Sequence, residues 1–291
     1  MADATAPMGP QSCRWEDLRK EPIEEVMCRV EGGLGVRLDR DTARTKRRSV
    51  GARSDRGTWV RIEGRPLVTM SAQGQAGNGM EAAALLHGIA KPEWYRALSW
   101  HDPAGGLAWR ADEVELVTAD PVQRGPLRDD VFPADAWWAA LNDSMNALAG
   151  QHTTRVATPD TEVITQKLVT REIERVFPGR VDSTITGPWT PAHADLNWSN
   201  LTGPEFWILD WEDHGMAPRG LDSANLWASS LTVPELAERV YRERRADLET
   251  RSGKVMALFC AAKLLNDSSV PAYLREIATR EADKLVNGLE R

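Results

Sequence analysis

The segment HADLNWSN, residues 193–200, brings together side chains that can accept a proton or bind a cation. It supplies Asp195 and Asn200, and Asp210 follows ten residues after Asn200 in ILDWEDHG. Carboxylate and amide oxygens are hard ligands, which suit Mg²⁺ and do not suit Zn²⁺. The Asp195 carboxylate could accept the proton of a substrate hydroxyl while the other two side chains hold the metal. A general base beside a magnesium site is the apparatus for moving a phosphoryl group.

The chain between Asn200 and Asp210 predicts how these two residues meet. The Gly203-Pro204 pair is a turn signal, and FWILDWE after it is typical of a short apolar strand. We expect a hairpin of two short strands that places Asn200 beside Asp210. Asp195 would lie on the loop that leads into this hairpin.

This spacing resembles that of the aminoglycoside phosphotransferase and choline kinase family, which has a protein-kinase-like fold. That family carries H-x-D-x-x-x-x-N, followed by a short strand that ends in Asp. This chain has His193, Asp195 and Asn200 at the same spacing, and Asp210 ends ILD. Downstream, APRGLDSANLW resembles the family's proline, glycine and D-x-A segment, with Asp222 as its aspartate.

The resemblance, which covers about residues 190 to 227, implies a role for each of these side chains. Asp195 would be the catalytic base, and Asn200 and Asp210 would bind Mg²⁺ on the phosphates of ATP. His193 and Asp222 would brace the loop that carries the base. The sequence does not distinguish ATP from GTP.

The first part of the chain departs from the family's pattern. Kinase-like enzymes hold the α- and β-phosphates with a strand lysine paired to a helix glutamate, but no lysine lies between Lys46 and Lys91. The best-placed cation is Arg61 in TWVRIE, with Glu81 in MEAAALL as its partner. Arginine stays charged and can bind phosphate through two hydrogen bonds. A surface arginine on an edge strand is the alternative interpretation, and the departure leaves open a degenerate kinase.

Two further segments have a place in the resemblance by their order along the chain. EGGLGVRLD, with Gly32, Gly33 and Gly35, could be a glycine-rich loop over the phosphates or a simple turn. VELVTADPV resembles the strand and hinge that receive adenine, with backbone hydrogen bonds near Val117 and Ala119.

Around these residues, the pattern predicts an α+β, two-lobed, protein-kinase-like fold. Two runs of SVGARSDRGTWVRIEGRPLV can pair across SDRG, and residues from about 26 to 70 are β-like. From about residue 134 the pattern is mostly helical. The predicted parts are a partly disordered lead-in, an N-terminal nucleotide-binding lobe and a C-terminal catalytic and substrate lobe, at residues 1–25, 26–119 and 120–291.

Tryptophans crowd the same region. Most of Trp189, Trp198, Trp207, Trp211 and Trp227 are expected in the core. Trp198, inside the loop that carries Asp195, is the one we expect to stack on a substrate.

Composition excludes several classes of protein. The net charge of −7 argues against nucleic acid as a partner. Without a signal peptide or a membrane-spanning run, we expect a cytoplasmic protein with no membrane partner, monomeric or homodimeric. Its cysteines, which are too few and too widely spaced for a disulfide framework, should be reduced thiols: Cys13, Cys28 and Cys260.

Rival sites find less support. The chain lacks a Walker loop, G-x-S-x-G and H-E-x-x-H. A hydrolytic metal site could in principle use four residues: His193, Asp195, Asp210 and His214. The other histidines show no ligand spacing that would complete it.

We therefore predict an ATP-dependent phosphotransferase that acts on a hydroxyl of a small molecule. From 187 to 235 there are seven acidic residues against Arg219 alone, which would suit a cationic acceptor such as an antibiotic or an amino alcohol. The alternative is a pseudokinase-like nucleotide-binding or regulatory protein.

Overall fold

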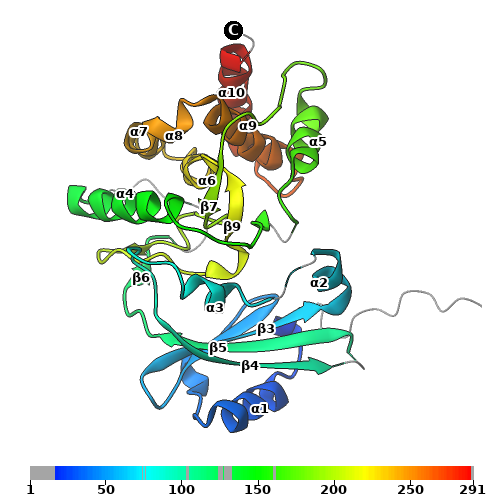
Figure 1. Ribbon diagram of the computed structural model, residues 1–291, viewed down its shortest axis with the longest axis vertical. Helices are drawn as coiled ribbons and strands as arrows, with labels where there is room; N and C mark the ends of the chain where they lie inside the picture. The colour runs from blue at the N-terminus through cyan, green and yellow to red at the C-terminus, as the bar shows by residue number, and fades with distance from the viewer. Residues whose placement is uncertain are drawn as a thin grey trace, which may run out of the picture. The chain divides into compact units, whose positions relative to one another are not determined.

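The computed structural model describes residues 17–73, 75, 77–102, 105–123, 127, 133–159 and 162–289. Their contacts form two compact units (Figure 1). The first consists of the described residues of Met1–Gly77 and Glu93–Leu116, and the second of those of Asn78–Pro92 and Val117–Arg291. The segment Asn78–Pro92 thus packs with the second unit, although it lies within the span 26–119 that the sequence analysis assigned to one lobe.

The first unit is an antiparallel sheet with strand order β1-β2-β3-β5-β4. Its strands are Arg44–Thr45 (β1), Ser49–Arg53 (β2), Thr58–Pro66 (β3), Trp94–Asp102 (β4) and Leu107–Glu115 (β5). Its helical segments are Leu18–Lys20 (η1), Glu24–Leu34 (α1), Arg40–Thr42 (η2) and Leu67–Gln73 (α2). Helix α1 shares one apolar core with the sheet (Figure 1).

The hairpin predicted across SDRG is confirmed as β2 and β3. Val60 and Ile62 are fully buried in the core shared with α1, and they alternate with Arg61 and Glu63 along β3. This alternation follows from the two-residue period of a strand. It places the charged side chains of β3 on the opposite face from α1.

The predicted β-structure does not begin at residue 26, because Glu24–Leu34 forms a helix, and the glycine-rich loop expected in EGGLGVRLD is wrong as well. Gly32 and Gly33 belong to α1, and Gly35 ends this helix with a φ of 64°, in the left-handed region. The helix forms because its buried side chains recur at helical spacing: Val26, Met27, Val30 and Leu34. Glycine is favoured at position 33 of this helix because the Leu98 side chain packs where a β-carbon would lie.

The second unit is mainly helical. Its helices are Gly79–Ala83 (α3), Asp135–Ala149 (α4), Gln166–Val176 (α5), Leu221–Ser229 (α6), Pro234–Glu243 (α7), Arg245–Leu248 (α8), Arg251–Asn266 (α9) and Ala272–Leu289 (α10). Helix α9 is almost wholly buried from Val255 to Ala262 and contacts α5, α6 and α10 (Figure 1). The predicted change to helical structure after residue 134 is confirmed.

Short strands provide the β-structure of this unit. They pair as β6 (Asp120–Pro121) with β8 (Thr202–Gly203) and as β7 (Trp189–Ala192) with β9 (Gly215–Pro218). The predicted strand FWILDWE reduces to one bridge, between Ile208 and Leu201, and the chain then enters a 3-10 turn at Trp211–Asp213 (η4). The strand stops early because Asp210 has a φ of 68°, which breaks an extended conformation.

No helix in the described part of the chain is long and apolar enough to cross a membrane. Cys28 and Cys260 are free thiols, while Cys13 and most of the predicted lead-in lie outside the described residues.

Candidate active site

Asp222 holds the start of residues 193–200, the segment called the site loop below. It lies in the first turn of α6, and its two carboxylate oxygens accept hydrogen bonds from the backbone amides of His193 (2.7 Å) and Ala194 (2.8 Å). Asn225, one turn further along α6, donates to the Ala194 carbonyl (3.0 Å). Ala194 has a φ of 75°, which costs free energy for a residue with a β-carbon. These three bonds stabilise that conformation.

The Asp222 carboxyl is buried, and burial raises its pKa even though the neighbouring His193 and the two amide donors act to lower it. A buried carboxylate is tolerated here because both oxygens are hydrogen-bonded. Asp222 therefore holds the backbone of the site loop through two buried hydrogen bonds.

The His193 ring joins the site loop to the residue before Asp210. It is fully buried, and its Nε2 donates to the carbonyl of Leu209 (2.8 Å). A carbonyl only accepts, so Nε2 carries the proton and Nδ1 can accept the Asp195 backbone amide (3.3 Å). The edge of Trp211 packs on the ring at 4.8 Å between centroids. His193 thus fixes the backbone of Asp195 relative to that of Asp210.

Two amide side chains orient the Asp195 carboxylate. Asn197 donates to its Oδ1 and Asn200 to its Oδ2, both at 2.9 Å. Asn200 also donates to the Asp195 carbonyl (2.8 Å). Sequence reasoning left Asn197 without a role, although an amide two residues after the proposed base could have suggested one. Both oxygens act as acceptors, so the orientation of this half-buried carboxylate is fixed.

The predicted pairing of Asn200 with the Asp210 region is confirmed in the backbone. Leu209 donates to the Asn200 carbonyl (2.8 Å), and Leu201 forms a bridge with Ile208. Asn200 and Asp210, the two proposed metal ligands, therefore lie next to this bridge, on the two arms of one hairpin. Asp210 follows directly, at the turn into η4.

The donor set fits a magnesium ion that is shared with phosphates. Among the described residues no group of three or more His, Cys, Asp or Glu side chains could hold a metal ion. Mg²⁺ needs only one or two carboxylates when phosphate and water oxygens complete its shell. Asp210 offers a carboxylate, and Asn200 commits its amide nitrogen to Asp195, which leaves its oxygen as a ligand.

A hydrolytic site built on the nearby histidines fits less well. Both ring nitrogens of His193 contact backbone groups, of Leu209 and Asp195. His214 is buried and donates through Nδ1 to the Trp211 carbonyl (2.8 Å). A metal on His193 would have to displace one of the bonds that shape the site loop.

Arg155 braces the segment that follows Asp210. Its buried guanidinium donates to the carbonyls of Glu212 (3.0 Å) and His214 (3.1 Å) and to the side chain of Asn78 (2.9 Å). The next residue, Gly79, starts α3 against the Glu212 backbone, where a β-carbon would have no room. The start of α3 and the chain after Asp210 are thus held as one piece.

The buried ring of His214 predicts an acid-sensitive stability. Burial lowers its pKa to about 4, with the charge of Arg155 acting in the same direction, and Nε2 is buried without a hydrogen-bond partner among the described residues. An unfolded histidine titrates near pH 6.5. As pH falls from about 6.5 to about 4, the unfolded chain therefore gains a proton that the folded chain does not bind, and stability falls.

We expect this histidine to contribute a loss of about 3 kcal/mol over that range. Chemical denaturation of wild type and His214→Asn at several pH values measures it. The wild-type curve should fall more steeply than that of the variant between pH 6.5 and 4. Parallel curves would contradict the assignment.

Trp198 is not available for substrate stacking, contrary to the prediction. Its side chain is 3% exposed, stacks on Trp137 at 5.7 Å between centroids and donates through Nε1 to Ser230 (2.8 Å). Trp138 meets it edge-on at 6.0 Å. The indole joins the site loop to α4 and to the end of α6, so its function is packing.

Removing this indole should destabilise the second unit. Trp198→Ala deletes a buried aromatic side chain and leaves a cavity, and we expect a loss of about 4 kcal/mol. Urea unfolding measures it, and Trp207→Ala, at a half-buried position, serves as the comparison. Equal losses in the two variants would show that the aromatic cluster adds nothing.

Arg61 lies on β3 of the first unit in an ion pair with its own strand. Its Nη1 donates to Glu63 (3.0 Å), which also accepts from Arg65 (2.9 Å). Glu63 is buried, which alone would raise its pKa, but the two guanidinium charges outweigh burial and hold the pKa below its usual range. The proposed partner Glu81 lies in α3 of the second unit, so its pairing with Arg61 stays a prediction.

The segment expected to receive adenine is neither helix nor strand. Strand β5 ends at Glu115, and Val117 to Ala119 connect it to β6. The role of Val117 and Ala119 stays a prediction.

Solved structures share this fold. The GDP complex of aminoglycoside 2′-phosphotransferase-IIIa matches with a TM-score of 0.57 and 14% identity, over 91% of this chain and 99% of that chain. A choline/ethanolamine kinase family protein from Mesorhizobium loti matches at 0.52 and 16%, over 92% and 95%. An amicoumacin kinase in complex with AMP-PNP and Ca²⁺ matches at 0.50 and 13%, over 91% and 96%.

These matches confirm the predicted architecture. No family model and no curated protein sequence matches the chain. At such low identity the structural likeness establishes the fold, which is that of protein-kinase-like small-molecule kinases. The fold alone does not determine which reaction, if any, the chain catalyses.

Proposed function

We propose that this chain, with the fold of small-molecule kinases, transfers the γ-phosphoryl group of ATP or GTP to a hydroxyl of a small molecule. The observation that carries the proposal is the arrangement around Asp195. A carboxylate oriented by Asn197 and Asn200 lies on a loop that His193 ties to the residue before Asp210. Phosphoryl transfer depends mostly on such positioning of base and metal ligands.

Each residue then has a task. Asp195 accepts the proton of the acceptor hydroxyl as it attacks the phosphorus. Asn200 and Asp210 would hold Mg²⁺, which when bound neutralises the charge of the nucleotide phosphates. His193 and Asp222 keep the loop in shape through the hydrogen bonds described above. Similar structures that contain AMP-PNP with Ca²⁺, or GDP, support a nucleotide and a divalent cation.

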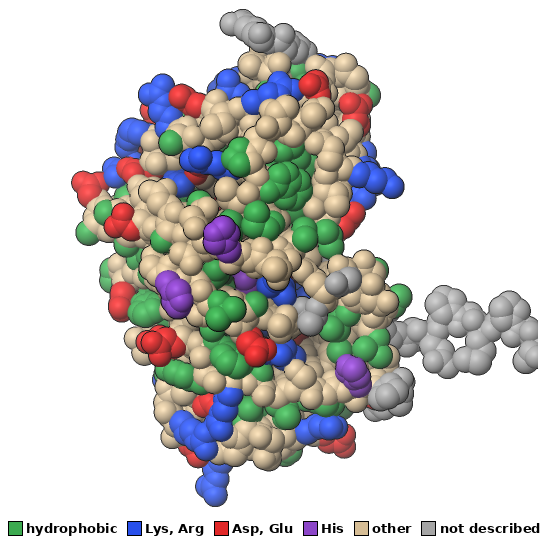
Figure 2. Space-filling view, in the orientation of Figure 1, with side chains coloured by type: hydrophobic (Ala, Val, Ile, Leu, Met, Phe, Trp, Pro, Cys, Tyr) green, Lys and Arg blue, Asp and Glu red, His purple; other side chains and the backbone are tan. Residues whose placement is uncertain are grey.

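The acceptor is proposed to be cationic, because acidic residues outnumber basic ones from 187 to 235. The carboxylates of Asp213 and Asp222 are buried and would not contact the acceptor, whereas those of Glu205 and Glu235 are exposed. On the face in Figure 2, Lys and Arg side chains lie among Asp and Glu side chains. We therefore expect a cationic acceptor to be attracted by carboxylates of the site and not by a uniformly acidic surface.

Salt provides a test of this acceptor class. Screening weakens attraction between exposed charges, so the KM for a cationic acceptor should rise several-fold between low and high ionic strength. The KM for a neutral acceptor serves as the control. A KM that does not depend on salt would contradict a cationic acceptor without affecting the phosphotransferase proposal.

A nucleotide-binding protein without turnover is the second candidate. Two observations favour it. No lysine lies between Lys46 and Lys91. Arg61 is paired with Glu63, so a nucleotide phosphate would have to compete with the Glu63 carboxylate for the Arg61 guanidinium. Thermal shift with Mg-ATP and Mg-GTP measures binding. Release of ADP or GDP with a panel of hydroxylated amines measures turnover. Binding with acceptor-dependent turnover supports the transferase, and binding without turnover supports the second candidate.

A further inference from the structure

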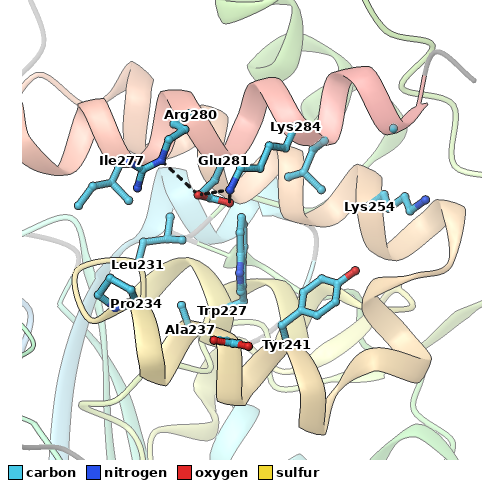
Figure 3. Close-up of a pocket in the computed structure, with 13 residues that line it drawn as sticks. Trp227, Leu231, Pro234, Ala237, Tyr241, Lys254, Ile277, Arg280, Glu281 and Lys284 are labelled. Atoms are coloured by element: carbon cyan, nitrogen blue, oxygen red, sulfur yellow. Dashed lines mark hydrogen bonds and ion pairs between the residues drawn. The ribbon is translucent and has the colours of Figure 1, made fainter.

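A cavity in the second unit is lined by residues that the proposed chemistry does not use. Its volume is about 490 Å³, and α6, α7, α9 and α10 contribute its walls (Figure 3). It has no residue in common with the site loop or with Asp210. Small-molecule sites are typically concave, largely apolar and about 300–1,000 Å³ in volume. The cavity therefore has the size of a ligand site.

Trp227 of α6 stands at the centre of this cavity. The residue is 8% exposed, and its indole N–H has no hydrogen-bond partner in the part of the chain that the structure describes. Figure 3 shows Leu231, Pro234 and Ile277 on one side of the ring. A largely buried indole with an unused donor, beside an apolar wall, suits a flat apolar group that carries an acceptor.

Polar groups occupy the other side of the ring. Figure 3 shows Tyr241 and Lys254 there. The Tyr241 hydroxyl is a neutral donor at physiological pH, as a tyrosine ordinarily is, and burial raises its pKa further. Neither the hydroxyl nor the Lys254 ammonium forms a hydrogen bond or ion pair with a side chain of the described residues. With Trp227, they make three donors on one cavity.

The charges of the wall favour an anion. Glu281 is neutralised by Lys284 (2.8 Å) and lies 3.5 Å from Arg280, as the dashed lines in Figure 3 show. Glu238 is the remaining carboxylate, and it is exposed to water. Lys254 is a half-buried cation of the lining and lies on the other side of the Trp227 ring from the apolar wall (Figure 3).

We propose that this cavity binds a small aromatic carboxylate, with its ring against Trp227 and its carboxylate held by Lys254 and Tyr241. The inference is independent of the proposed phosphotransferase activity. It rests on the donors, the apolar wall and the size of the cavity.

Three probes of one shape and different charge test the proposal: 2-naphthoate, 2-naphthamide and 2-naphthylmethylammonium. Calorimetric titration of the full chain measures the Kd of each. We expect 2-naphthoate to bind about tenfold more tightly than the amide, because a charge-assisted hydrogen bond replaces a neutral one. The ammonium should bind most weakly. Equal Kd values for the three probes, or no binding of 2-naphthoate at millimolar concentration, would overturn the proposal.

Variants locate the binding. Lys254→Gln should bring the Kd of 2-naphthoate close to that of 2-naphthamide, and Trp227→Phe should weaken both by removing the donor. Lys167→Gln, the same charge change on an exposed residue of α5, should leave all Kd values unchanged. If Lys254→Gln retains the preference for the carboxylate, the anion binds elsewhere. This variant changes a half-buried surface residue, so the test does not depend on whether Trp227→Phe folds.

Discussion

Replacing Asp195 with Asn should lower kcat for phosphoryl transfer about 10³-fold and leave nucleotide affinity within a few-fold of wild type. The substitution keeps the size of the side chain and removes its ability to accept a proton. In this variant the amide nitrogen of Asn200 can still donate to the backbone carbonyl of residue 195, and its side-chain oxygen can still bind the metal. Binding of the nucleotide and the chemical step are therefore separated in this variant.

Steady-state kinetics with saturating nucleotide and acceptor measure kcat, and calorimetric titration measures nucleotide affinity. Asp143→Asn, the same change at an exposed position of α4, is the matched control and should behave as wild type. If the Asp195 variant keeps more than a tenth of the wild-type kcat, this residue is not the base. If nucleotide binding is also lost, the carboxylate holds the metal site instead.

The parts of the site that sequence predicted are those built from neighbouring residues. Gly203-Pro204 is a turn signal, so the hairpin that brings Leu209 to Asn200 follows from a few consecutive residues. The motif spacing led to Asp195 in the same way. Even here the strand was predicted too long, because the left-handed conformation of Asp210 has no signal in FWILDWE.

What sequence did not predict depends on contacts between distant segments. Trp198 is buried because Trp137, about 60 residues earlier, stacks on it, and no local pattern records that pairing. Arg155 braces Glu212 and His214 from a segment without a recognisable motif. Gly33 was interpreted as part of a loop, since a glycine in a helix is explained only by the Leu98 side chain that packs on it.

These distant contacts explain why α6 matters to the site as much as the loop itself. Asp222 and Asn225 of α6 hold Ala194 in its left-handed conformation, and Ser230, just after α6, accepts from Trp198. Without these hydrogen bonds, Ala194 would relax to a more common backbone conformation. The position of Asp195 therefore depends on the first turn of a helix that starts 26 residues later.

Asp222→Ala should accordingly cost both stability and turnover. It leaves the amides of His193 and Ala194 without their acceptors in a buried place, at about 1–3 kcal/mol each, so we expect a loss of about 3 kcal/mol or more in unfolding free energy. Without these bonds the site loop can relax, and kcat should fall at least about 100-fold.

Asp222→Asn separates the two effects. Its side-chain oxygen can still accept one amide, while its NH₂ group faces the other donor, so we expect a smaller loss of stability and a kcat between those of wild type and Asp222→Ala. Denaturant unfolding and steady-state kinetics on the same preparations measure both, with exposed Asp143→Asn as the control. If Asp222→Ala unfolds more readily yet keeps wild-type kcat at a temperature where it is folded, Asp222 supports the fold alone. A fall in kcat that persists in the folded variant identifies it as the residue that positions the base.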